Sequence, residues 1–230
     1  MPTEPTNRRP LKTRDWPFFK KLAAWLARSG ATPNGISFAS IVFGCAAGAA
    51  LALTSQLDGW ALCGSWLVAA VFIQLRLIAN LLDGMVAVEG GKGGPTGELW
   101  NEAPDRVSDG AIFIGAGFAV GSDPLLGMGA ALVAVFVAYV RALGASVGAG
   151  QIFLGPMAKP HRMAVMTFAC VLSALFPPLM TFYFQDTYYI ILAAQVFIQL
   201  PLLMVILGGV ITAIRRFRRI AAFLRTSPRS

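Results

Sequence analysis

The chain has 230 residues, of which 56% are hydrophobic and only 13% charged, and its net charge is +8. These proportions exclude an ordinary soluble domain, in which about a quarter of the residues are charged. Apolar runs long enough to cross a bilayer, about 20 residues each, recur along most of the chain. The composition therefore predicts an all-α integral membrane protein built as one helical bundle.

The N-terminal region precedes the first apolar run. Residues 1–11 are polar and rich in proline, and we expect them to be disordered. Residues 12–30 predict an amphipathic juxtamembrane helix, because aromatic and aliphatic residues alternate with Lys and Arg at helical spacing. Two arrangements remain open for this helix. It lies in the cytoplasmic interface with its aromatic side in the lipid, or it packs against the bundle.

Six apolar segments predict a six-helix transmembrane domain over residues 31–214. They cover roughly 33–55, 60–88, 98–120, 124–148, 162–184 and 187–213. Lys and Arg are concentrated before the first segment and in a basic tail over residues 215–230. The loops on the other side carry Asp58, Asp123 and Asp186 but no Lys or Arg. The positive-inside rule therefore places both termini and the 89–97 loop on the cytoplasmic side of the cell (inner) membrane.

The basic termini also bear on the partners of the protein. Beside transmembrane helices, such residues are expected to meet anionic lipid headgroups. We therefore expect membrane lipids and no nucleic acid as partners.

The stretch from Asn80 to Asp109 holds more than half of the chain's eleven acidic residues. Asn80 and Asp83 are three residues apart, whereas Asn101, Asp105 and Asp109 are spaced by four, so on helices each set shares one face. The segment between the sets is too rich in Gly and Pro to remain helical. Two helices joined by such a loop can point their oxygen atoms at each other, and a hard cation such as Mg²⁺ prefers carboxylate and amide oxygens. All five residues are therefore candidate metal ligands.

The same stretch resembles the signature of the CDP-alcohol phosphatidyltransferases, Asp-x-x-Asp-Gly-x-x-Ala-Arg followed after a short spacer by Gly-x-x-x-Asp-x-x-x-Asp. Eight residues separate Val88 from Gly97, and the matching positions are Asp83, Gly84, Ala87, Gly97 and Asp105. The chain departs from the signature where Asn80 and Asn101 replace the first and third Asp, and where Val88 replaces the Arg.

The resemblance implies a reaction in phospholipid biosynthesis. A phosphatidyl or other substituted phosphoryl group would pass from CDP-diacylglycerol or another CDP-alcohol to an alcohol acceptor, phosphorylated or not, with release of CMP. It further implies Mg²⁺ or Mn²⁺ as cofactor, Asp105 as the catalytic base, a homodimer, and access of the nucleotide to the backbone at Gly84, Ala87 and Gly97. Because Asn80 and Asn101 add no charge, we expect one firmly held metal ion rather than two.

Two further groups have two interpretations each. Thr32, Pro33 and Asn34 form an ordinary helix start, while the resemblance places such a triplet near the nucleotide. Arg141, Lys159, His161 and Arg162 gather at the cytoplasmic ends of two segments, where they either bind phosphate or merely flank the membrane. Tyr-x-Arg and Pro-x-Arg patterns here resemble members that use inositol phosphate, which implies that this group binds the acceptor's phosphate.

Arg76 lies within an apolar segment, on the same helical face as Asn80 and Asp83. A guanidinium at that depth requires a partner, and we expect Asp109 or Asp83, in a structural role. Two other functions stay open beside the enzyme. A catalytically impaired CDP-lipid-binding membrane protein would explain the two Asn replacements, and a small transporter would explain the charges within the membrane.

Overall fold

A computed structural model of the chain describes residues 15–89, 97–184 and 187–226, and it places their side chains except those of 89, 98, 101 and 176–195. This part of the chain is entirely helical, which confirms the predicted all-α class. The elements are α1 (Pro17–Arg28), α2 (Pro33–Leu53), the short 3-10 helix η2 (Thr54–Gln56), α3 (Gly59–Glu89), α4 (Gly97–Gly117), α5 (Pro124–Ser146), α6 (Lys159–Phe184) and α7 (Thr187–Thr226).

Each of the six predicted segments corresponds to one long helix, α2 to α7. Four helices in the described ranges are long and apolar enough to cross a membrane, and they belong to α2, α3, α5 and α7. Helix α4 is not among them, because Glu98, Glu102, Asp105, Arg106 and Asp109 all lie in its first two thirds. The largest difference in length is at α7, which continues through the basic residues to Thr226.

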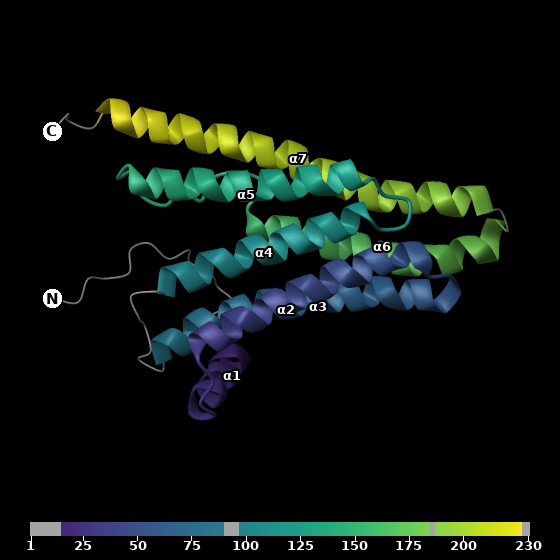
Figure 1. Ribbon diagram of the computed structural model, residues 1–230, viewed down its shortest axis with the longest axis horizontal. Coiled ribbons are helices and arrows are strands. Elements are labelled where there is room, and N and C mark those ends of the chain that lie inside the picture. The colour runs from purple at the N-terminus through teal and green to yellow at the C-terminus, as the bar shows by residue number, and fades with distance from the viewer. Residues whose placement is uncertain (1–14, 90–96, 185–186, 227–230) are drawn as a thin grey trace.

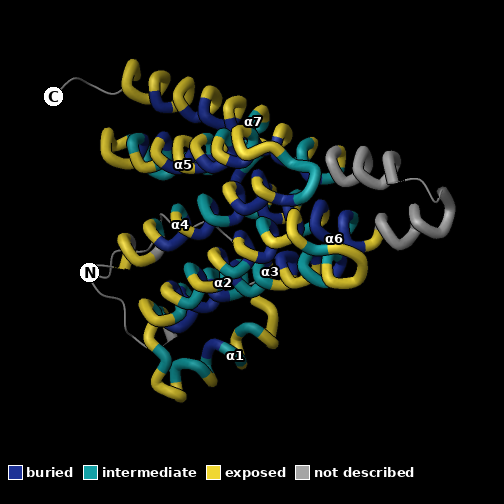
Figure 2. The backbone as a smooth tube through the Cα atoms, turned by 45° about the vertical axis from the view of Figure 1, so that its right-hand side comes forward, coloured by how far each residue is buried: buried dark blue, intermediate teal, exposed yellow. Residues whose placement is uncertain are grey.

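The long helices lie side by side in one bundle (Figure 1). Helix α2 packs against α3 and α4, α4 also contacts α5, α5 contacts α7, and α6 lies against α3 and α7. The buried surfaces of the helices face one another, and their outer surfaces are exposed (Figure 2). The end of α3 and the start of α4 lie at the same end of the bundle, which is the left end in Figure 1.

The contact between α2 and α4 depends on small residues. A Cβ atom added at Gly48 would lie 2.3 Å from the carbonyl oxygen of Ala111, and one added at Gly115 would lie 2.1 Å from that of Gly48. The Ser108 hydroxyl donates a hydrogen bond to the Ser40 carbonyl oxygen across the same contact, at 3.0 Å. Small residues allow helices in membranes to approach this closely, and the approach fixes the polar side of α4 within the bundle.

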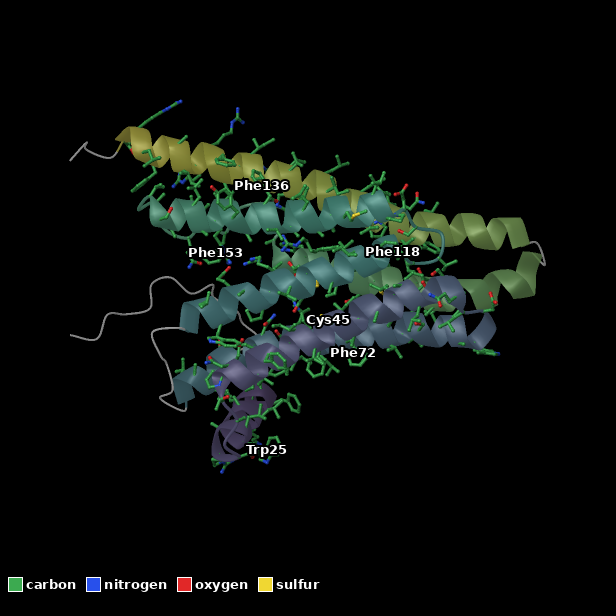
Figure 3. All side chains as sticks on the ribbon, in the orientation of Figure 1. Trp25, Cys45, Phe72, Phe118, Phe136 and Phe153 are labelled. Atoms are coloured by element: carbon green, nitrogen blue, oxygen red, sulfur yellow. The ribbon has the colours of Figure 1, made fainter. Side chains whose placement is uncertain are left out.

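Helix α1 is set steeply against the long helices (Figure 1). Ala23 is fully buried in a cluster with Leu82 and Val86 of α3, so one side of α1 packs against the bundle. The other side exposes large apolar rings, among them Trp25 (Figure 3). Trp16, the residue directly before α1, is exposed as well. Packing against the bundle, one of the two arrangements left open by the sequence, is thus present.

Candidate functional site

The candidate site is a polar cluster where α3, α4 and α6 meet. Helix α3 contributes Arg76, Asn80 and Asp83, whose spacings of four and three residues place them on one face. Helix α4 contributes Asp105 and Asp109 in the same way. Asp83, Asp105 and Asp109 are all buried, with 5%, 6% and 1% of their surface exposed.

Asp105 is the residue on which three helices converge. Its Oδ1 atom accepts hydrogen bonds from Asn80 Nδ2 at 2.8 Å and from Arg76 Nη2 at 3.2 Å. The same oxygen also accepts one from the ammonium group of Lys159, the first residue of α6. The predicted catalytic base is therefore an ion-paired carboxylate.

Asp109 lies one turn further along α4 and holds two guanidinium groups. Its Oδ1 accepts from Arg76 Nη2 at 2.6 Å and its Oδ2 from Arg162 Nη2 at 2.7 Å. The expectation that Arg76 pairs with Asp109 is confirmed, although its second partner is Asp105 rather than Asp83. Arg162 is fixed as well, since its Nη1 donates to the Met157 carbonyl oxygen at 3.2 Å.

Asp83 has a different partner, the hydroxyl of Ser37 on α2. Ser37 Oγ lies 2.8 Å from Asp83 Oδ2, and the backbone N–H of Gly84 donates to Asp83 Oδ1. The sequence analysis did not single out Ser37. A signal was present, because Ser37 precedes Gly44 by seven residues and so lies on the small-residue face that α2 presents to its neighbours.

The cluster is electrically balanced. Its three carboxylates are matched by three cations, those of Arg76, Lys159 and Arg162. The Lys159 ammonium interacts electrostatically with Asp83, Asp105 and Asp109. Lys159 lies outside the four apolar spans, and desolvation lowers the pKa of its ammonium group to about 8, an effect that the Asp105 carboxylate opposes.

The donor set can be tested against the expected cation. Within the described residues, no group of three or more His, Cys, Asp or Glu side chains is arranged to hold a metal ion. Asp83, Asp105 and the amide oxygen of Asn80 fit a cation that completes its coordination with water and substrate phosphates, which is how Mg²⁺ usually binds. The Lys159 ammonium shows that a cation is attracted to this position. The side chain of Asn101, another predicted ligand, lies outside the described residues.

The predicted nucleotide-binding residues lie at the same end of the bundle. Gly84 and Ala87 follow Asp83 on α3, and Gly97 begins α4. Thr32, Pro33 and Asn34 begin α2 one turn before Ser37, and Thr32 Oγ1 accepts a hydrogen bond from Gly35 N at 3.1 Å. The interpretation of Thr32 as a helix cap is therefore confirmed.

The four predicted phosphate-binding residues are divided among three environments. Lys159 and Arg162 belong to the carboxylate cluster, whereas His161 is exposed on the surface. Arg141 donates to Glu102 on α4 at 2.6 Å, and its guanidinium lies 5.6 Å from the ring centre of Phe153. Glu102 also pairs with Arg106, which lies four residues later on the same helix.

An apolar cavity of about 490 Å³ lies beside the cluster, between α1, α2 and α3. Its wall includes Ala79 and Leu82, the residues that immediately precede Asn80 and Asp83. Thr32, at the start of α2, also lines it. Helix α3 therefore separates the polar cluster from an apolar space at the same level of the bundle.

Comparison with known proteins finds similar structures but no similar curated sequences or family models. No model of a protein family and no curated protein sequence matches the chain. Three solved structures of phosphatidylinositol phosphate synthase from Mycobacterium tuberculosis are similar to it. The one with CDP-DAG bound has 19% identity and a TM-score of 0.66, over 88% of this chain and 92% of the synthase.

The other two structures give closely similar values. The complex with manganese and citrate has 20% identity and a TM-score of 0.68, over 91% and 90% of the two chains. The apo form has 20% identity and a TM-score of 0.64, over 87% and 95%. The chain therefore shares its helical fold with these synthase structures over nearly their whole length.

Proposed function

We propose that this protein is a membrane CDP-alcohol phosphatidyltransferase. It moves a phosphatidyl or other substituted phosphoryl group from a CDP-linked donor to an alcohol acceptor, and it releases CMP. One observation carries the proposal: two buried carboxylates from different helices, Asp83 and Asp105, lie in one cluster with Lys159. The fold that holds them is shared with a synthase that was solved with CDP-DAG bound.

Asp105 takes the proton of the attacking hydroxyl in this proposal. A general base must lie within hydrogen-bond reach of the proton that it removes. Three donors engage Asp105 Oδ1, and none of the described residues donates to Oδ2, so Oδ2 is the oxygen that meets the acceptor. Asn80 and Arg76 hold the carboxylate in position while this happens.

Bound Mg²⁺ or Mn²⁺ would supply positive charge to neutralise the donor's pyrophosphate, which would favour the departure of CMP. Asp83, Asp105, Asn80 and Asn101 are its proposed ligands, and manganese is present in one structure of the similar synthase. Asp109 is fully engaged by Arg76 and Arg162, so we assign it to the support of the cluster rather than to the metal.

The donor is proposed to be a lipid, CDP-diacylglycerol. The apolar cavity between α1, α2 and α3 has room for part of an acyl chain, and its wall is continuous with the residues that flank Asn80 and Asp83. The nucleotide then lies over Gly84, Ala87 and Gly97, near the start of α2. Arg141 is proposed to meet the phosphate of a phosphorylated acceptor, with Lys159, His161 and Arg162 completing the basic side of the site.

The position in the membrane follows from charge and from the surface of α1. All six long helices cross the bilayer in this proposal, with both termini and the site on the cytoplasmic side of the inner membrane. The ion pairs of α4 support this, because Arg76 neutralises Asp105 and Asp109, two of the acidic residues that make α4 less apolar than the other spans. The exposed Trp25 of α1 and Trp16 directly before it then lie in the cytoplasmic interface. A homodimer is proposed on the resemblance alone.

The test measures CMP. The purified protein is incubated with CDP-diacylglycerol, Mg²⁺ or Mn²⁺, and a panel containing inositol phosphate, glycerol phosphate and serine. We expect CMP release with one acceptor, its loss in Asp83→Ala and Asp105→Ala, and its retention in Asp58→Asn, which changes a carboxylate at the opposite end of the bundle. Full activity in either Ala variant would remove the assignment.

A second candidate function has one observation in its favour. Because Asp105 and Asp109 are already ion-paired, a protein that binds a CDP-lipid without transfer is consistent with the cluster. Binding of CDP-diacylglycerol with no CMP release from any acceptor would identify this function.

A further inference from the structure

The ammonium group of Lys159 lies where a cation ligated by Asp83 and Asp105 would be attracted. It donates to Asp105 Oδ1, and it interacts electrostatically with Asp83 as well. A divalent cation held by these carboxylates would meet this positive charge at close range. Both charges cannot occupy the same position, and their mutual repulsion is strong at a few ångströms inside a protein.

The three cations of the cluster differ in their freedom to leave. The side chains of Arg76 and Arg162 are 0% and 3% exposed, and both hold Asp109. The Lys159 side chain is 25% exposed, and Asp105 is its one ion-pair partner among the described residues. Lysine carries its charge on a flexible stem with rotatable donors, so its ammonium can move while the backbone of α6 remains in place.

We propose that Lys159 is an internal counter-ion, which neutralises Asp105 while the site is empty and competes with the divalent cation for it. This inference rests on the proposed function and adds a coupling to it. A nucleoside diphosphate supplies both phosphate oxygens for the cation and a new negative partner for the ammonium group. The cation therefore binds weakly alone and more tightly together with the diphosphate.

The experiment measures binding of Mn²⁺ by electron paramagnetic resonance, with and without cytidine diphosphate, and needs no turnover. In Lys159→Met we expect Mn²⁺ alone to bind about tenfold more tightly or better, because the competing charge is gone. The gain in affinity on adding cytidine diphosphate should be smaller in this variant than in the wild type. Lys159→Arg, which keeps the charge, should bind Mn²⁺ no more tightly than the wild type.

Arg106→Met is the matched control, because it removes a nearby cation that pairs with Glu102 and not with Asp105. Its Mn²⁺ affinity should equal that of the wild type. Lys159→Gln serves in the same way as Lys159→Met if the latter does not fold. Unchanged or weaker Mn²⁺ binding in the folded neutral variants would overturn the counter-ion role.

The counter-ion role of Lys159 and the proposed transferase function can be rejected independently of each other. Release of CMP by the wild type together with unchanged Mn²⁺ affinity in Lys159→Met rejects the counter-ion and leaves the transferase. Tighter Mn²⁺ binding in Lys159→Met without CMP release by the wild type supports the counter-ion and rejects transfer.

Discussion

Replacement of Arg76 by Met tests whether the ionic cluster holds the fold together. Arg76 is fully buried, and its Nη2 atom lies 2.6 Å from Asp109 and 3.2 Å from Asp105. Its removal leaves Asp105 and Asp109 each with one cation fewer. Breaking a buried ion pair by removing one partner costs about 3–5 kcal/mol.

The expected loss is smaller than that range. Arg76 Nε and Nη1 lack a hydrogen-bond partner among the described residues, and Met removes these two desolvated donors. Each such donor costs about 1–3 kcal/mol when it is buried unpaired, so even the lower figure offsets about 2 kcal/mol of the loss. We therefore expect a net loss of about 1–3 kcal/mol, which lowers the Tm of a chain of this length by roughly 2–12 °C.

Thermal unfolding in detergent measures this change, with Arg106→Met as the control. Arg106 and Glu102 are 23% and 40% exposed, and Glu102 keeps Arg141 as a second partner. Their pair should contribute no more than about 1 kcal/mol. Equal stability of the two variants would refute the view that a buried ionic cluster stabilises this bundle.

Three more substitutions test the packing and the site. Gly48→Val should destabilise the protein by about 1–3 kcal/mol and reduce CMP release, because the new side chain meets the α4 backbone. Gly64→Ala is the control and should be neutral or slightly stabilising, because a Cβ atom there has nothing within 4 Å. Equal Tm values for the two variants would contradict this. Thr32→Ala should cost about 1 kcal/mol of stability through the lost cap, and an unchanged KM for the donor would show that Thr32 serves α2 alone. Arg141→Gln should raise the KM for a phosphorylated acceptor by roughly tenfold or more, since a charge-assisted hydrogen bond contributes about 1.5–3 kcal/mol. The KM for an unphosphorylated acceptor should be nearly unchanged. An equal rise in KM for both acceptors would assign Arg141 to the support of Glu102.

The sequence predicts those parts of the molecule that depend on local pattern. Apolar runs identify all six long helices, because hydropathy and length are properties of each segment alone. The spacing of Asn80 with Asp83, and of Asp105 with Asp109, predicts which side chains share a face. The short loop between α3 and α4 then predicts that the two faces meet, and the bond between Asn80 and Asp105 is the result.

Long-range partners are a different matter. Lys159 and Arg162 pair with Asp105 and Asp109, which lie more than fifty residues earlier in the chain, and the sequence does not predict these pairs. Their binding of phosphate stays a prediction. The sequence of α6 carries no signal that it packs against α3. The pairing of Arg141 with Glu102 was missed for the same reason, since it depends on which helices become neighbours. For Ser37, the small-residue face of α2 was a signal, but its pairing with Asp83 also depends on the packing of two helices.

The pairing of charges links the fold of α4 to the chemistry of the site. A helix with Asp105 and Asp109 on its inner face is stable in an apolar bundle only when both carboxylates are neutralised, because an unpaired buried charge is costly. Arg76 and Arg162 neutralise Asp109 from two helices and are both buried. Neither can leave Asp109 without leaving its buried carboxylate with less neutralising charge. Lys159 alone is partly exposed and can exchange Asp105 for a phosphate while a divalent cation takes its place. In this proposal, release of Lys159 frees Asp105 to act beside Asp83, which has no ion-pair partner among the described residues, while Asp109 stays held by its two arginines.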